Sequence, residues 1–272
     1  MQDEALRIED LHLTYRGLSG TAFSKPGAYG FFSTIQQRDD DAELISGANL
    51  SLKRGETLCI GGPSGQGKSA LLRVIAGLAR PSSGRVFYFG EYIPPERLTA
   101  LEVAKRQVGL VFQNGALISN LRVRDNIALP LRYHKKGSAE EIEEKINMAL
   151  DLMRVRDCAN MFPHQLSVGM QKRVAIARSW AMDPMLLLMD EPTAGLDNYN
   201  RRNLLPLIDN MRTLFKTSII IITHDLMIAK ELGCNLCFLY HKKLTEPHSF
   251  DYWLNADNDI SKVLFRDLRT SG

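Results

Sequence analysis

The chain has 272 residues, enough for one large α/β domain or for a domain with a subdomain. With 44% hydrophobic and 24% charged residues it resembles ordinary globular proteins, and a net charge of +3 is too small to predict binding to nucleic acid or to an anionic membrane. The longest apolar runs are far too short to cross a bilayer, and no apolar signal region opens the sequence, so we expect a protein that is neither secreted nor membrane-spanning.

The first strand in chain order is expected over residues 5–15, where apolar and polar residues alternate. Residues 16–45 are rich in Gly, Ser, Pro and Asp and show no period, which predicts a long inserted loop. The aromatic side chains in this loop could dock a partner or pack on the loop's own domain. Further strands are expected over residues 48–60 and 85–90.

A phosphate-binding pattern follows the short apolar segment that ends at Ile60. It has glycine, four residues and then Gly-Lys-Ser, and it spans Gly62, Pro63, Ser64, Gly65, Gln66, Gly67, Lys68 and Ser69. The glycines allow the backbone to curl around a polyphosphate, Lys68 adds a cation for the outer phosphates, and Ser69 offers a hydroxyl to Mg²⁺. A helical period over residues 69–78 follows, so an accidental glycine-rich turn is disfavoured.

The second half of the chain alternates helices with short buried strands. A capping box begins a helix at Ser138, and its apolar stripe predicts a structural role in the core. Helices are also expected over 167–182 and 200–215, and buried strands over 186–189 and 218–223. This alternation predicts a mostly parallel sheet covered on both faces.

Two acidic residues, Asp190 and Glu191, end the strand expected over 186–189. Because parallel strands present their carboxyl ends to the ligand crevice, Asp190 is placed to orient the Mg²⁺ shell and Glu191 to polarise an attacking water. Alternatively, the two acids could simply mark a strand leaving the core.

Four cysteines do not amount to a disulfide framework, and they indicate a reducing compartment. Cys234 and Cys237 have C-x-x-C spacing, but the chain has neither a second such pair nor a nearby histidine pair. Small buried residues are therefore favoured over metal or redox chemistry.

The segment Leu166-Ser167-Val168-Gly169-Met170-Gln171 resembles the signature of the ATP-binding cassette (ABC) ATPases, usually Leu-Ser-Gly-Gly-Gln. Ser167 can cap the next helix and Gly169 permits close backbone approach, so the helix start forms a second anion site. In the family this site, which includes the position of Met170, faces the ATP of a partner cassette. Val168 and Met170 depart from the usual residues, which predicts activity with altered energetics of dimer closure.

Other family elements follow the same order as in this sequence. By resemblance, Gln113 is the Q-loop glutamine that contacts Mg²⁺ and water, Asp197 lies in the D-loop at the dimer interface, and His224 is the switch histidine that contacts the γ-phosphate. The resemblance implies a metal shell of Ser69, Gln113 and Asp190, an ATP contact at Ala70, and catalytic roles for Lys68, Glu191 and His224. Tyr15 resembles the aromatic residue that stacks on adenine; a plain strand-end tyrosine is the alternative.

At the subfamily level, residues 112–117 and 125–131, the Gly-Met ending of the signature and residues 263–268 resemble the ATPases of bacterial lipid transporters that work with MCE-domain proteins, such as the Mla system. The insertion over 16–45 departs from the Mla pattern. The fold implied is an α/β ABC nucleotide-binding domain with a RecA-like core, an antiparallel β-subdomain and a helical subdomain over 114–167.

The resemblance implies a homodimer that binds ATP and Mg²⁺ and drives a membrane permease, with no role for nucleic acid. We expect a peripheral protein on the cytoplasmic face of the bacterial inner membrane, energising phospholipid transport with an MCE-domain partner. The permease is expected to dock on the surface around Gln113 and residues 117–124. A transporter for lipoprotein release or small solutes and a non-transport ABC ATPase remain the alternatives.

Overall fold

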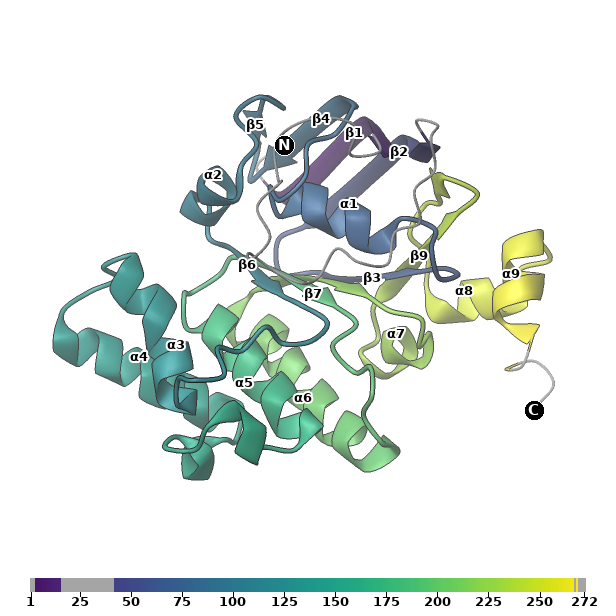
Figure 1. Cartoon of the computed structure of the whole chain (residues 1–272). Coiled ribbons are helices and arrows are strands. Elements are labelled where there is room, and N and C mark those ends of the chain that lie inside the picture. The colour runs from purple at the N-terminus through teal and green to yellow at the C-terminus, as the bar shows by residue number, and fades with distance from the viewer. Residues whose placement is uncertain (1–2, 16–41, 267, 269–272) are drawn as a thin grey trace.

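The computed structural model describes residues 3–15, 42–266 and 268, which form two sheets with helices around them (Figure 1). An antiparallel sheet has the order β2-β1-β4-β5. Its strands are β1 (Glu4–Tyr15), β2 (Ala42–Lys53), β4 (Ser83–Tyr88) and β5 (Glu91–Ile93). The larger sheet has the order β10-β9-β3-β8-β7-β6. Its strands are β3 (Thr57–Gly61), β6 (Val108–Val111), β7 (Leu186–Asp190), β8 (Ser218–Ile222), β9 (Asn235–Tyr240) and β10 (Lys243–Leu244).

Strands β6, β7, β8, β3 and β9 run parallel to their neighbours, and β10 returns antiparallel to β9. The described helices are α1 (Lys68–Ile75), α2 (Ala100–Lys105), α3 (Val123–Tyr133), α4 (Ala139–Leu152), α5 (Val168–Trp180), α6 (Asn198–Phe215), α7 (Met227–Glu231), α8 (Phe250–Asn255) and α9 (Asp259–Leu264). In Figure 1, α1 lies between the two sheets, whereas α5, α6 and α7 lie on the opposite side of the larger sheet.

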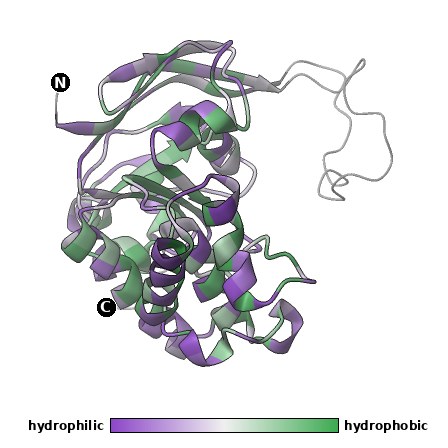
Figure 2. Ribbon diagram, turned by 90° about the vertical axis from the view of Figure 1, so that its left-hand side faces the viewer, coloured by the Kyte–Doolittle hydropathy of each residue, from purple (hydrophilic) through white to green (hydrophobic). Residues whose placement is uncertain are grey.

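Alternating side chains of the larger sheet divide the hydrophobic core in two. Leu58 and Ile60 of β3 face α1 and the antiparallel sheet, whereas Cys59 between them faces the helices on the other side. Strands β3 and β8 are buried along their whole length, as expected of parallel strands covered on both faces. Figure 2 shows the hydrophobic residues of these strands lying inside the molecule, with hydrophilic residues on the outer turns of the helices.

Helices α3, α4 and α5 pack together beside this sheet and share the core on its helical face. Helix α4 begins at Ser138 with the predicted capping box, since the Ser138 hydroxyl accepts from the Glu141 N–H and the Glu141 carboxylate accepts from the Ser138 N–H. Helix α5 has buried residues around most of its circumference, so it is the central helix of this group.

The long loop predicted over residues 16–45 falls mostly outside the described residues, which resume at residue 42. Its last four residues, 42–45, instead form the start of β2, where Glu43 pairs with Thr14 and Ile45 with Leu13. The run of aspartates that precedes this strand hid its beginning, because the apolar alternation becomes visible only from Leu44 onward.

The two cysteines with C-x-x-C spacing point into different environments. Cys237 is fully buried with the core that faces the antiparallel sheet, whereas Cys234 packs at the edge of the other core, with its sulfur 3.6 Å from that of Cys59. In the described part of the chain, no three or more potential metal-ligating side chains lie close enough together to hold an ion. Among the same residues, no helix is long and apolar enough to cross a membrane.

Candidate functional site

The glycine-rich loop leaves β3 at the carboxyl end of the strand and leads directly into α1. Gly62 has a φ of 134°, and a Cβ there would lie 2.4 Å from the carbonyl oxygen of Leu239. Gly67 takes a left-handed φ of 97° at the start of α1. A side chain at residue 62 would collide with the backbone of Leu239, and one at residue 67 would strain the backbone. Glycine is therefore required at both positions. A glycine-rich loop that leads into a helix start in this way can present its N–H groups to an anion.

Lys68 is buried in this loop and its ammonium is held by the loop itself. Its Nζ donates to the carbonyl oxygens of Gly62 at 2.7 Å and Pro63 at 2.8 Å. Burial lowers the pKa of Lys68, and the charges of Glu191 and Asp190 act in the opposite direction. A cation is thus kept beside the loop, balanced by two carboxylates from another strand.

The strand order brings the other polar residues to the same edge. Strands β3, β8, β7 and β6 are consecutive neighbours, and their last residues are aligned, since Ile222 pairs with Ile60 on one side and with Asp190 on the other. His224 follows β8, Glu191 follows β7 and Gln113 follows β6. Residues more than a hundred positions apart therefore lie along one edge of the sheet.

Ser69 and Asp190 form the first pair at this edge, with the Ser69 hydroxyl donating to Oδ1 of Asp190 at 3.1 Å. Burial raises the pKa of Asp190, while the bond from Ser69 opposes that rise. A hydroxyl and a carboxylate are oxygen ligands of the type Mg²⁺ accepts, and two such groups suit an ion that takes its remaining ligands from phosphates and water. The residues present therefore fit a magnesium ion bound together with a nucleotide.

Glu191 and His224 form the second pair, with Nδ1 of His224 2.9 Å from Oε2 of Glu191. The Glu191 side chain is 12% exposed and that of His224 is 67% exposed, so the pair reaches from the buried strand end to the open face. Glu191 has a left-handed φ of 47°, unusual for a residue with a side chain, and its N–H donates to Ile222 at 2.9 Å. This turn aims the carboxylate toward His224.

The predicted signature begins α5 on the other side of the larger sheet from α1. Ser167 caps the helix by accepting from the N–H of Met170 at 3.3 Å, as expected. A Cβ on Gly169 would lie 3.1 Å from the side chain of Asn200, so glycine at this position allows the start of α5 to approach α6 closely. The side chain of Met170 packs against the hydrophobic core, which leaves its backbone as the part available to a ligand.

The remaining predicted residues lie in several places. Asp197 caps α6 by accepting from Asn200 at 2.7 Å. Gln113 is exposed and lines a cavity of about 370 Å³ together with Val168 and Gly195. Tyr15 is the last residue of β1, but its side chain lies outside what the structure describes. Within the glycine-rich loop, Ser64 and Gly65 are exposed, Gln66 accepts from the His241 N–H at 3.2 Å, and Ala70 packs against the core.

Three polar residues that organise the site are absent from the sequence predictions. The amide of Asn126, fully buried in α3, bonds to the backbone of residues 118, 121 and 122. Lys172 and Arg178 of α5 donate to backbone carbonyls of the loop after β6. For Lys172 and Arg178 the available signal was their position among the apolar residues of α5, because a charged residue in a largely buried helix must find a partner.

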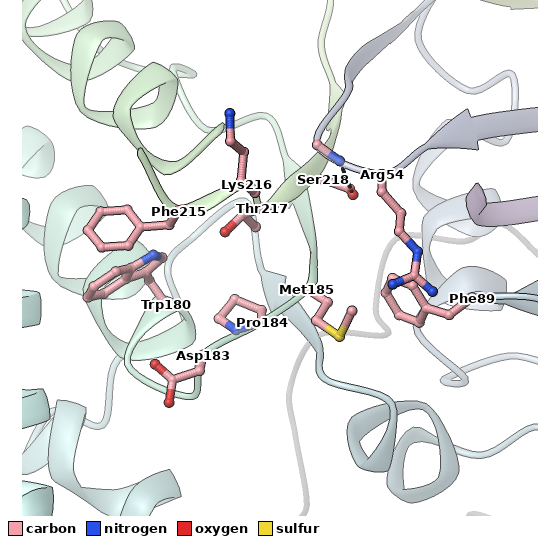
Figure 3. Close-up of a pocket in the computed structure, with 11 residues that line it drawn as sticks. Arg54, Phe89, Trp180, Asp183, Pro184, Met185, Phe215, Lys216, Thr217 and Ser218 are labelled. Atoms are coloured by element: carbon pink, nitrogen blue, oxygen red, sulfur yellow. Dashed lines mark hydrogen bonds between the residues drawn. The ribbon is translucent and has the colours of Figure 1, made fainter. Parts of the chain in front are cut away.

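A cavity of about 530 Å³ lies at the amino ends of β3, β7 and β8, far from the edge that holds the glycine-rich loop (Figure 3). Its walls include Arg54, Phe89, Trp180, Phe215 and Lys216. Because Lys68 and Glu191 lie at the carboxyl ends of these strands, the cavity is separate from their site.

Comparison with known proteins agrees with this geometry. The sequence profile of the family described as "ABC transporter" matches residues 45–194. A "Probable sulfate/thiosulfate import ATP-binding protein CysA" of Chlorella vulgaris is 36% identical over 212 residues, covering 78% of this chain and 87% of the relative. An "Intermembrane phospholipid transport system ATP-binding protein MlaF" of Escherichia coli is 32% identical over 224 residues, covering 82% of this chain and 83% of that protein.

Among solved structures, a dimeric post-hydrolysis state of the ATP-binding cassette MJ0796, bound to ADP and Pi, matches with a TM-score of 0.74 and 28% identity. The match covers 90% of this chain and 98% of the cassette. The chain spans between 49% and 87% of the length of the first three curated relatives, which are named for import of sulfate/thiosulfate or spermidine/putrescine.

The chain belongs to the ABC transporter family and has the ABC nucleotide-binding cassette fold. Cassettes of this family bind ATP with Mg²⁺, hydrolyse it, dimerise and work with membrane permeases. The chain is therefore an ATPase subunit of an ABC transporter, and ATP and Mg²⁺ are its cofactors.

Replacing Asp190 with Asn should stabilise the nucleotide-free protein at pH 7. A carboxyl group whose pKa is higher in the folded than in the unfolded chain binds its proton more tightly when folded, so its ionisation destabilises the fold as pH rises above 3.8. Asn keeps an acceptor for Ser69 and removes the charge. We expect Tm to rise by up to about 4 °C in calorimetry at pH 7 and by less at pH 5, whereas Mg²⁺-dependent ATPase activity is lost.

The matched control is Asp157→Asn, because Asp157 is an exposed carboxylate outside the site. This control should leave both Tm and activity unchanged. An unchanged or lower Tm for Asp190→Asn would show that the buried carboxylate is not a source of instability.

Proposed function

We propose that this cassette energises the movement of phospholipid or another apolar lipid between membranes, together with a permease and an MCE-domain protein. The observation that carries the ATPase part of the proposal is the convergence of Lys68, Asp190, Glu191 and His224 at the ends of adjacent strands. The lipid part is supported by the similarity to MlaF over most of both chains and by the Gly169-Met170 ending of the signature.

In the proposed reaction, the N–H groups of residues 62–69 and the ammonium of Lys68 hold the phosphates of ATP. The Glu191 carboxylate accepts a hydrogen bond from the attacking water and orients it. His224 holds the γ-phosphate and also restrains the Glu191 carboxylate, because its Nδ1 lies 2.9 Å from Oε2 of Glu191. Ser69, Asp190 and Gln113 would hold the magnesium ion, which when bound would offset negative charge on the transferred phosphoryl group. Positioning and charge stabilisation supply the rate enhancement.

The proposal assigns the second anion site to a partner copy. Ser167, Gly169 and the backbone of Met170 contact the nucleotide held on the loop of the other copy, and Asp197 lies at the same interface. Support comes from the start of α5, where Val168 is exposed and the Ser167 hydroxyl satisfies only one of the free N–H groups of the helix. Ala70 and Tyr15 complete the contacts with ATP, with Tyr15 against the adenine.

The substrate is the less constrained part of the proposal, because relatives named for sulfate/thiosulfate and methionine import match at similar identity. A solute importer is therefore the second candidate, and every role in ATP hydrolysis is the same for both. In either case we place the cassette on the cytoplasmic face of the bacterial inner membrane.

Residues 114–167 are the proposed helical subdomain, and the surface around Gln113 and residues 117–124 is the proposed docking site for a permease helix. Ile118 in this loop is apolar and 37% exposed, and Asn126 fixes the loop from beneath by bonding to both the N–H and the carbonyl of Ile118. On α3, which follows this loop, exposed Leu129 and Tyr133 border a cavity of about 440 Å³ against β6. A rigid apolar rim of this kind suits an amphipathic helix.

Glu191→Gln should bind ATP with nearly unchanged affinity but hydrolyse it at least 100-fold more slowly, since the base that orients water is lost while the phosphate contacts remain. The slow variant should accumulate as a dimer with ATP and Mg²⁺, measurable by size-exclusion chromatography with light scattering. If Glu191→Gln hydrolyses ATP at the parental rate, Glu191 does not orient the attacking water.

Ile118→Glu should weaken association with the permease, because it places a charge where an apolar helix would dock, while ATP hydrolysis by the purified cassette is retained. Co-purification of the tagged cassette with membrane proteins measures the effect, and at least a tenfold loss is expected. Met148→Glu is the matched control, since Met148 is an exposed apolar residue on α4 outside this surface. Equal recovery of the permease with both variants would contradict the docking site.

Mass spectrometry of the native complex, extracted mildly from its own membrane, tests the transported class. We expect a permease, an MCE-domain protein and bound phospholipid or another apolar lipid. Recovery of a permease with a solute-binding or lipoprotein-release partner would replace the lipid proposal with the second candidate. Recovery of no permease at all would contradict a role in transport.

A further inference from the structure

We infer that Lys172 is a positioning residue that ties the helix of the signature to Glu191 and to the loop of Gln113, so that movement of α5 sets the geometry for hydrolysis. Lys172 lies in the second turn of α5, five residues after the Ser167 cap. No contact of Lys172 with ATP is required. The inference rests on the proposed roles of Glu191 and Gln113.

The contacts of Lys172 reach two separate elements of the site. Its Nζ donates to the carbonyl oxygen of Glu191 at 3.0 Å and also to that of Gln113. The side chain is 5% exposed and lies beside the cavity that Gln113 and Gly195 line. A buried ammonium needs such partners, because an unpaired charge in the interior is strongly unfavourable, and here two carbonyl dipoles replace water.

The contact with Glu191 falls on a residue whose backbone needs support. Glu191 has a φ of 47°, and its N–H is held by Ile222. Its carbonyl oxygen accepts from the N–H of Ala194 at 3.1 Å and from Lys172. Because the peptide groups on both sides of the Glu191 Cα are fixed, its side chain leaves the backbone in one direction, toward His224.

The contact with Gln113 belongs to a set of bonds from α5 to β6 and to the loop that follows it. Arg178 donates to the carbonyl oxygens of Gly115 and Ala116, both at 2.8 Å, and Ser179 donates to that of Leu110 at 2.6 Å. Lys172 is the member of this set that also bonds to Glu191. The loop therefore moves with α5, and Lys172 passes that movement to the end of β7.

Electrostatics places the same ammonium near the two acids. Glu191 and Asp190 favour the charged form of Lys172, while burial lowers its pKa. The charges of the same two acids also favour the charged form of Lys68. One lysine of the phosphate loop and one of α5 therefore interact favourably with the same pair of acids.

The test compares Lys172→Met with Arg178→Gln in the full chain. Met preserves the shape of the lysine stem but bonds to neither carbonyl, whereas Arg178→Gln weakens the contacts with residues 115 and 116 and leaves Glu191 untouched. Amide hydrogen exchange on the nucleotide-free protein should show at least tenfold faster exchange over both 113–118 and 191–195 for Lys172→Met. For Arg178→Gln the increase should be confined to 113–118.

Steady-state kinetics supplies the second readout. For Lys172→Met we expect kcat to fall about 10- to 100-fold, with KM and the Kd of a fluorescent ATP analogue changed less than about threefold, because the phosphate loop is unaltered. Lys172→Arg keeps a cation with several donors and should recover a substantial part of kcat. Lys105→Met, at an exposed lysine on α2, controls for loss of a charge and should match the parent.

Failure of the inference is separable from failure of the proposed function. Unchanged exchange over 191–195 in Lys172→Met, or parental kcat in a variant that does exchange faster, would overturn the role of Lys172. Parental hydrolysis by Glu191→Gln would instead overturn the assignment of the base. If Lys172→Met is too unstable to purify, Lys172→Gln, which removes the charge and is too short to reach the position of Nζ, is measured in the same way with the same expected results.

Discussion

The location of the candidate site, at the carboxyl ends of the strands of the larger sheet, depends on one constraint. The short parallel strands are buried on both faces. Strands β3 and β8 are buried at every residue and β7 at all but its last, so no side chain within them can reach solvent. Polar chemistry is possible only where the strands end. Because β3, β8, β7 and β6 are neighbours in register, their ends bring the glycine-rich loop, His224, Glu191 and Gln113 to one line.

Where these strands end, the opposite charges of Asp190 and Lys68 lie in a partly buried site and favour each other's charged form. Burial disfavours ionisation of Asp190 and protonation of Lys68, and in each case the opposite charge nearby acts against the effect of burial. Each charge therefore partly offsets the cost of burying the other. The arrangement keeps oxygen ligands and a cation beside the phosphate loop.

Much of this could be predicted from the sequence, because strands and helices alternate with clear apolar periods and the glycine-rich loop has a fixed spacing. The residues at strand ends were predictable for the same reason, since Asp190 follows an apolar run directly. Two kinds of feature were not. The start of β2 was hidden by a polar flank, and the partners of Lys172 and Asn126 are backbone groups, which leave no trace in residue identity. A helix capped by Ser167 was predictable, but its approach to Asn200 depends on tertiary packing.

The position of α5 explains how one helix can serve two sites. Its first turn carries the signature, and its later turns lie in the core. From these later turns, the side chains of Lys172, Arg178 and Ser179 donate hydrogen bonds to backbone carbonyl groups of Glu191, Gly115 and Leu110. A helix of this length is stiff, so a displacement of its exposed start also moves its buried turns. If the start of α5 contacts nucleotide on a second copy, movement of α5 on binding would shift Lys172 and, through it, the backbone of Glu191 in the same copy. Hydrolysis and dimer closure are then linked through a single rigid element, which requires no change in the fold of either sheet.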